Sequence, residues 1–343
     1  MRTALIILLA FAAGVLVTQW LPPHGLAQPG IPAAARADGA PTSSASSTDA
    51  GDDADPASAA SWPDSAPSPE QVMGAQPRLV AAALAGLAPR VPGKPNLYLV
   101  TFAGDAGEDV FRNEAEYAAQ LFTTRFGPTA HALVLENNPD TLATRPLASW
   151  SNLEAALVGV ERAMKPEQDI LVLYVTTHGD EDHNLLVDMD PLPLDQIGAS
   201  DLAAILAKRS FKWKVLVVSA CYSGGFVPPL HGPGTLVITA ARTDRSSFGC
   251  GSDSDATYFG KAWLVDALNK TPDFIDAFHL ASGEITQWEQ RDRLTPSEPQ
   301  ISVGAGIASQ LALWRKGFTP GAPVPFVPAV PATASSAAAA SSP

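Results

Sequence analysis

Two short apolar runs in this chain each end on a residue that can carry chemistry. The first covers residues 169–177 and leads into His178 and Gly179, and the second covers residues 213–220 and leads into Cys221. Short β-branched runs bounded by polar or glycine-rich segments are typical of strands buried on both faces of a parallel sheet. The sequence therefore predicts two buried strands, each followed directly by a reactive side chain.

A predicted helix separates the two runs. It extends from Ser200, as N-cap, to about Lys208, and Leu202, Ile205 and Leu206 form its apolar face. A strand, a helix and a second strand form a right-handed crossover, which makes the strands parallel and close. Their carboxyl ends then share one edge of the sheet, where open α/β proteins place their sites. We expect the thiol and the imidazole to meet there as a nucleophile and its base.

The rest of the chain between residues 95 and 318 alternates in the same way. Further strands are predicted over residues 96–102, 131–135 and 235–240, and further helices over residues 108–126, 151–164 (capped by Ser151), 258–268 and 274–288. Alternation of strand and helix predicts an α/β fold: a three-layer α/β/α sandwich on a mostly parallel sheet.

The residues around the two strand ends resemble those of a known family. Thr-Thr-His-Gly at residues 176–179 and Ser-Ala-Cys-Tyr-Ser-Gly-Gly at residues 219–225 are similar to the His-Gly and Ala-Cys-x-Ser-Gly blocks of legumain-type cysteine peptidases, family C13. That family belongs to the caspase-like clan and includes the catalytic subunit of GPI transamidase. The resemblance implies a caspase-like fold and an exported, bacterial-type member. Further similar blocks lie at residues 111–115, 239–241, 246–250 and 257–260, so that the resemblance extends over about residues 95–317.

The resemblance also implies a mechanism. In the family the cysteine attacks the peptide carbonyl and the histidine moves the proton, which assigns Cys221 as nucleophile and His178 as general base and acid. The amides of Gly179 and Cys221 would form the oxyanion hole, each worth ~3 kcal/mol. This describes a cysteine endopeptidase that acts on peptides or proteins through an acyl-enzyme and needs no cofactor. A transpeptidase or transamidase with the same dyad, and a catalytically silent domain that binds partners, remain alternatives.

The substrate pocket is where the sequence departs from the family. Legumain-type S1 pockets bind asparagine with an arginine and two acids. Ser219 and Lys261 stand at the positions of the two acids, and Val110 stands where the family has an asparagine that assists the dyad. An arginine left without counter-charge favours a carboxylate, so we hypothesise cleavage after Asp rather than Asn. The S1 residues implied by the resemblance are Arg112, Ser219, Ser246, Ser247 and Lys261.

Two other features have alternative interpretations. The segment from His178 to His183 contains two histidines and three acids, which could hold zinc, but no further ligand set is apparent and no metal is predicted. We interpret it as a solvated acidic loop that carries the catalytic histidine. Cys250 is either a structural thiol or a redox latch on Cys221.

The amino terminus predicts export. Residues 1–27 comprise a positive start at Arg2, an apolar run over residues 4–17 and a small-residue cleavage site at residues 25–27. Extended to residue 21, the apolar run reaches ~19 residues, the lower limit for a membrane span. The segment is therefore a cleaved signal or an anchor, and the rest of the chain lies on the periplasmic or extracellular face, secreted or held at the inner membrane.

Amino-acid composition separates the rest of the chain into a linker, a domain and a tail. Residues 28–70 and 319–343 are dominated by Ala, Pro and Ser, which predicts a disordered linker and tail around a peptidase domain at residues 95–318. Residues 71–87 are predicted to form a short helix packed on the domain. A net charge of −13 argues against nucleic acid as a partner. With two cysteines, the chain has no disulfide framework.

Overall fold

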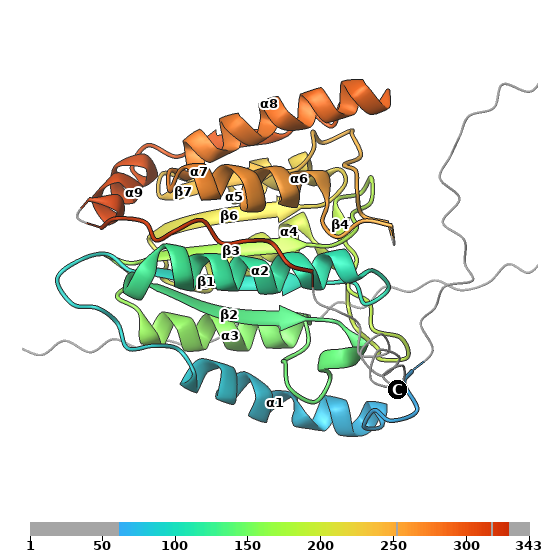
Figure 1. Cartoon of the computed structure of the whole chain (residues 1–343). Helices are drawn as coiled ribbons and strands as arrows, with labels where there is room; N and C mark the ends of the chain where they lie inside the picture. The colour runs from blue at the N-terminus through green and yellow to red at the C-terminus, as the bar shows by residue number, and fades with distance from the viewer. Residues whose placement is uncertain (1–61, 252, 317, 329–343) are drawn as a thin grey trace, which may run out of the picture. The chain divides into compact units, whose positions relative to one another are not determined.

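A six-stranded sheet with strand order β2-β1-β3-β6-β7-β8 runs through the protein (Figure 1). All neighbouring strands are parallel except β8, which pairs antiparallel with β7 at one edge. The computed structural model describes residues 62–251, 253–316 and 318–328. The strands are β1 Leu97–Ala103, β2 Ala130–Glu136, β3 Ile170–Thr176, β6 Trp213–Ser219, β7 Thr235–Thr239 and β8 Gln300–Val303.

Helices cover both faces of this sheet, because alternate strand residues point to opposite sides and both sets are apolar. Tyr174 of β3 faces one helical layer and Leu173 faces the other. The predicted three-layer α/β/α sandwich is thereby confirmed. One layer contains α2 Asp109–Arg125, the continuous helix of α6 Tyr258–Gly260, η4 Lys261–Ala267 and α7 Leu268–Lys270, α8 Phe274–Asp292 and α9 Ile307–Arg315; the other contains α3 Trp150–Ala163, α4 Ala199–Ala207 and α5 Val227–Leu230.

The strands and helices predicted for the core are present, but two helix caps differ. Ser149, not Ser151, caps α3, because its side chain accepts a hydrogen bond from the amide of Asn152. Gly198, not Ser200, precedes α4, because the short strand β5 Ile197–Gly198 pairs with β4 Asn184–Leu185 and keeps the chain extended up to that point. The sequence analysis missed β8 and α9, which are short, and β8 lies half-exposed at the sheet edge.

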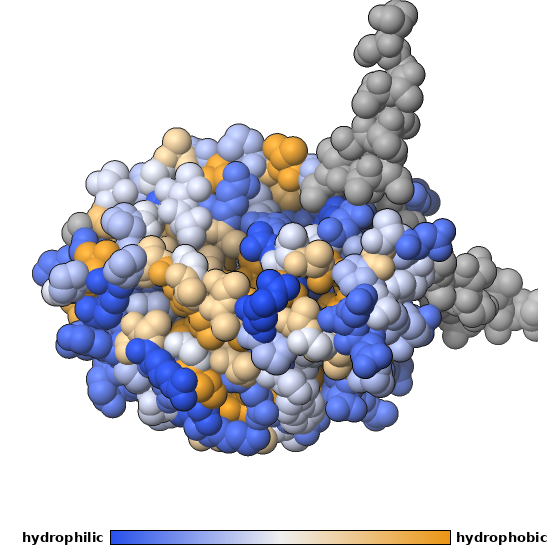
Figure 2. Space-filling view, turned by 90° about the horizontal axis from the view of Figure 1, so that it is seen from below, coloured by the Kyte–Doolittle hydropathy of each residue, from blue (hydrophilic) through white to orange (hydrophobic). Residues whose placement is uncertain are grey.

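At the amino end of the packed domain, the helix predicted over residues 71–87 is present, and it begins two residues earlier than predicted. The helix α1, Pro69–Ala85, packs on α3, where Leu84 fills the space beside Gly159. Arg90 forms a 2.7 Å ion pair with the buried carboxylate of Asp169, just before β3. Seen from the α1 side, patches of apolar residues lie between hydrophilic ones on the surface (Figure 2). Alanines of α1 remain exposed there.

The carboxyl end also differs from the prediction. The stretch predicted to be a disordered tail from Thr319 includes residues 319–328, which lie in extended form over α2 (Figure 1). Val324 is buried, and its carbonyl accepts a hydrogen bond from the hydroxyl of Tyr117 at 2.8 Å. The ring of Phe326 packs edge-on against Tyr117. Isolated apolar side chains and backbone hydrogen bonds anchor a segment whose Pro- and Ala-rich composition indicated disorder.

The predicted signal or anchor over residues 1–27, most of the linker and the end of the tail lie outside the described residues. Within the described ranges, no helix combines the length and apolarity required to cross a bilayer.

Candidate active site

The two strands predicted to carry the reactive residues are neighbours in the sheet. Thr176 at the end of β3 pairs in register with Ser219 at the end of β6. The ladder continues one step further, since the amide of Thr177 donates to the carbonyl of Ser219 at 3.2 Å. His178 follows Thr177 directly and Cys221 follows Ser219 by two residues, so both leave the same edge of the sheet from neighbouring strands.

Gly179 packs directly on the backbone of the cysteine. A Cβ atom at this position would lie 2.4 Å from the carbonyl oxygen of Cys221 and 3.2 Å from the Cβ of Ala220. Only a residue without a side chain allows this approach. The two amides that the family resemblance assigns to an oxyanion hole consequently belong to touching segments.

A third strand end contributes a carboxylate. Asp105 follows β1, the neighbour of β3, and its Oδ2 lies 3.6 Å from the Nε2 of His178. This is ion-pair range, slightly longer than a hydrogen bond. Burial raises the pKa of Asp105 and lowers the pKa of His178, and the attraction between the two groups partly offsets both effects. The ring of Phe111 packs edge-on against the imidazole at 5.1 Å.

The sequence analysis missed Asp105, although a signal was present. Ala-Gly-Asp at residues 103–105 closes a buried strand in the same way that His178 and Cys221 close theirs. Val110, at the position of the family's assisting asparagine, is buried in an apolar cluster with Phe111 and Val134. The group that faces the imidazole thus comes from five residues earlier in the chain.

The sulfur of Cys221 contacts a loop that follows β7. The amide of Ser247 donates to Sγ at 3.3 Å, and the Ser247 carbonyl lies 3.6 Å from Sγ. Tyr222, the next residue after the cysteine, has a positive φ of 54°, a conformation that non-glycine residues adopt uncommonly. Its amide donates to the carbonyl of Arg245 at 2.8 Å. The chain therefore turns sharply after Cys221, and the loop around Ser247 holds the turn.

His183 supports this turn from the other side. One ring nitrogen, Nδ1, lies 3.1 Å from the carbonyl oxygen of Tyr222, and the other, Nε2, lies 3.2 Å from the hydroxyl of Thr243. The ring lies over Gly225, where a Cβ would approach it to 2.2 Å. Both nitrogens of the second histidine in the acidic loop are thus engaged. In the parts of the chain that the structure describes, no cluster of side chains is suited to a metal ion.

Arg112 differs from its predicted state. It is 3% exposed and forms ion pairs with Asp140 at 3.0 Å and with Asp109 at 3.5 Å. The hydrogen bond from its Nη1 to Asn138 is 2.9 Å long. Asn138 and Asp140 follow β2 and Asp109 begins α2, so none of these partners lies in the short blocks that carry the resemblance. The expectation of an arginine without counter-charge is wrong. The hypothesis of cleavage after Asp thereby loses its main support.

The remaining predicted S1 residues are dispersed. Lys261 forms a 2.6 Å ion pair with Asp266 on its own helix. Ser246 is exposed, whereas Ser247 contacts the nucleophile as described above. Ser219 is buried, with its hydroxyl 3.4 Å from that of Thr257. Of the five predicted residues, Ser219 lies at the end of β6 and Ser247 contacts the sulfur of Cys221.

A buried acid that the sequence analysis missed lies beside Ser219. Glu114 of α2 is 1% exposed and accepts hydrogen bonds from Tyr174 and Thr176, both at 2.7 Å. The amide of Thr257 donates to its other oxygen at 2.7 Å. Burial raises the pKa of this carboxyl. Glu114 connects α2, the end of β3 and the start of α6 beneath the candidate site.

The second cysteine lies in the same region. Cys250 packs against the apolar cluster of Val110, Phe111 and Ala115, and neither cysteine forms a disulfide in the described structure. The predictions of a structural thiol and of a redox latch both stay predictions.

Comparisons with known proteins agree with the predicted family resemblance. Residues 151–310 match the model of the Peptidase C13 family. This segment contains His178 and Cys221 but neither Asp105 nor Arg112. No curated protein matches the chain. Among solved structures, caspase-1 from Spodoptera frugiperda is similar with a TM-score of 0.44 and 12% sequence identity, covering 61% of this chain and 87% of the caspase chain.

Proposed function

We propose that the chain is a cysteine endopeptidase, on the premise that residues 151–310 match the model of the Peptidase C13 family. The family match supports a cysteine-peptidase type of function with peptides or proteins as substrates. The observation that carries the proposal is the contact between the two strand ends: the Thr177–Ser219 hydrogen bond and the packing of Gly179 on Cys221.

In the proposed reaction, Cys221 gives its thiol proton to His178 and the sulfur attacks the carbonyl carbon of the scissile bond. The amides of Gly179 and Cys221 stabilise the negative oxygen that forms. His178 then returns the proton to the leaving amine, and the C–N bond breaks to leave a thioester on Cys221. Water, deprotonated by His178, hydrolyses this acyl-enzyme and releases the sulfur.

Asp105 is the proposed positioning residue for His178. Its carboxylate faces Nε2, which leaves Nδ1 as the ring nitrogen on the side away from the carboxylate. A negative charge there also favours the imidazolium that forms during the reaction. The 3.6 Å separation would shorten once substrate binds and water leaves the site.

Replacing Asp105 with Asn tests this role through the pH profile. The carboxylate raises the pKa of His178, so its removal lowers that pKa. Since the imidazole must be neutral to accept the thiol proton, the acidic limb of kcat/KM should move to lower pH. The plateau should fall by about 10- to 100-fold, because the ring loses its orienting partner. The exposed Asp195→Asn is the matched control, and identical profiles for the two variants would refute the role of Asp105.

The protease proposal is tested most simply by a peptide-library cleavage profile of the purified chain. We expect cleavage of internal peptide bonds and, in the presence of added amines, hydrolysis products in excess of amide products. The profile also reports the residue preferred before the cleaved bond. Predominant transfer to the amine would instead favour the transpeptidase alternative, and no cleavage by folded protein would favour a partner-binding domain.

We also propose that residues 1–27 direct export. A reporter fused after Gly30 should be active outside the cytoplasm, whereas a matched fusion that begins at Gln28 should remain inside. Mass spectrometry of the mature amino terminus separates the two forms: a start at Gln28 means a cleaved signal, and an intact Met1 means an anchor. Equal distribution of the two fusions would contradict export.

A further inference from the structure

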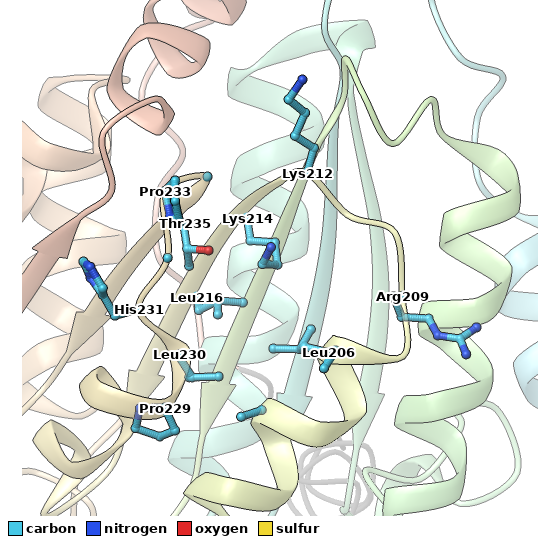
Figure 3. A pocket seen from close by; sticks show the side chains of 14 residues that line it. Leu206, Arg209, Lys212, Lys214, Leu216, Pro229, Leu230, His231, Pro233 and Thr235 are labelled. Atoms are coloured by element: carbon cyan, nitrogen blue, oxygen red, sulfur yellow. The ribbon is translucent and has the colours of Figure 1, made fainter.

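A cavity of about 360 Å³ lies at the amino ends of β6 and β7, the opposite end of the sheet from Cys221 (Figure 3). Small-molecule sites in proteins start at roughly 300 Å³. The walls come from the end of α4, from α5 and from the loop before β7. Leu206, Leu216, Pro229 and Leu230 make much of this lining apolar.

The ionisable residues of the lining are all basic. Arg209, Lys212, Lys214 and His231 contribute to it, and no aspartate or glutamate does. The chain as a whole carries a net charge of −13, so the cavity is a basic site on an acidic protein. Such a concentration of positive charge favours an anionic occupant.

Lys214 differs from the other cations because its charge lacks a nearby acid. Arg209 pairs with Glu161 at 3.3 Å, and Lys212 pairs with Glu167 at 3.0 Å. In Figure 3 their charged ends point away from the cavity, whereas Lys214 lies among the lining side chains. Its ammonium donates to the carbonyl of Phe211 at 2.8 Å, and no acid of the described residues lies within ion-pair distance.

The surroundings of the Lys214 ammonium indicate the chemical class of the ligand that the cavity would bind. Lys214 is half-buried, and burial lowers its pKa. An anion beside it would restore the electrostatic stabilisation that water no longer provides. Thr235, its register partner on β7, lines the same cavity and offers a hydroxyl group. The leucine walls would exclude water from an apolar group attached to the anion.

We propose that this cavity binds a carboxylate attached to an apolar group, with Lys214 as its counter-charge and Leu206, Leu216 and Leu230 around the apolar part. Two sources carry this chemistry: a small organic acid and the carboxyl end of a peptide with an apolar last residue. The site is separate from the proposed active site, and its occupation does not require peptidase activity.

Isothermal titration calorimetry of the full chain as its Cys221→Ala variant, which prevents cleavage of peptide probes, tests the proposal. The probes are hexanoate with its matched amide hexanamide, and acetyl-leucyl-leucine with its carboxamide. At least one acid should bind saturably and about 10-fold or more tightly than its amide, because only the acid pairs with the ammonium. Saturable binding of hexanoate would show that a small organic acid is enough to occupy the cavity. Binding of acetyl-leucyl-leucine but not of hexanoate would show that the ligand is the carboxyl end of a peptide.

Three substitutions in the same background assign the effect. Lys214→Met should abolish the preference for acid over amide, Lys214→Arg should retain it, and Lys270→Met should leave it unchanged, since Lys270 is exposed on α7 and does not line the cavity. Circular dichroism and thermal unfolding verify that each variant is folded. Equal binding of acids and amides, equal losses in Lys214→Met and Lys270→Met, or no saturable binding of either acid would each overturn the proposal.

Discussion

Replacing Cys221 with alanine should lower the rate of peptide cleavage at least about 10³-fold without unfolding the protein. The side chain is half-buried and its contacts are the weak ones with Ser247, so the loss of the sulfur leaves the packing of β6 intact. His178→Ala should cause a loss of similar size, since the thiol then has no proton acceptor. A double variant should be no slower than either single variant, because the two groups act as a unit.

The chain offers matched controls for both substitutions. Cys250→Ala removes the other thiol and His279→Ala removes an exposed imidazole on α8. Both should keep near-normal kcat/KM in a fluorogenic peptide assay. Near-normal cleavage by either dyad variant, or a loss in Cys250→Ala as large as in Cys221→Ala, would show that the nucleophile or its base is assigned incorrectly.

Gly179→Ala should also nearly abolish activity, by a different physical route. The new methyl group would lie 2.4 Å from the carbonyl oxygen of Cys221, so one of the two segments must move. Loss of one oxyanion donor alone costs about 10²- to 10³-fold in kcat. Overpacking should in addition lower the free energy of unfolding by about 1–3 kcal/mol.

Gly283→Ala is the control for this substitution, since no atom lies within 4 Å of a Cβ at that helical position. It should keep full activity and raise the free energy of unfolding by about 0.5–1 kcal/mol, because alanine is the better helix former. Activity and thermal unfolding of the two variants are measured side by side. Full activity in Gly179→Ala would contradict an oxyanion hole at this position.

The sequence could predict the sheet and the neighbouring positions of His178 and Cys221 because both depend on local pattern. Strands such as β3 and β6 are buried on both faces, which produces continuous apolar runs that few other structures require. The right-handed crossover through α4 then fixes their order, and His178 and Cys221 follow at the strand ends. The same reasoning would have found Asp105 had the end of β1 been treated in the same way.

Other parts of the site depend on contacts between distant segments, which a local pattern does not contain. Arg112 is paired with Asp140, a residue that follows β2, and Glu114 is held by Thr257, which lies 143 positions later. Neither pairing has a signal in spacing or periodicity. A pocket built from motif positions alone therefore assigned Arg112 a charge without a partner and left out the buried acid.

At the carboxyl end of the domain, amino-acid composition alone also gave a wrong prediction. Proline predominates in residues 319–328, yet Val324 and Phe326 pack on the domain and the amide of Gly321 donates a hydrogen bond to the carbonyl of Arg125 in α2. Average composition predicts disorder by the low content of apolar side chains. An average composition cannot show that two apolar side chains, Val324 and Phe326, pack on the surface of the domain.

Labelling with a peptide that carries a thiol-directed electrophile tests the central claim most directly. Intact-mass analysis followed by peptide mapping locates the adduct. The proposed mechanism predicts one adduct per chain, on Cys221, formed at the same rate in Cys250→Ala and much more slowly in His178→Ala, where the thiol has lost its base. An adduct on Cys250, equal labelling with and without His178, or no adduct on the folded protein would contradict a Cys221–His178 peptidase.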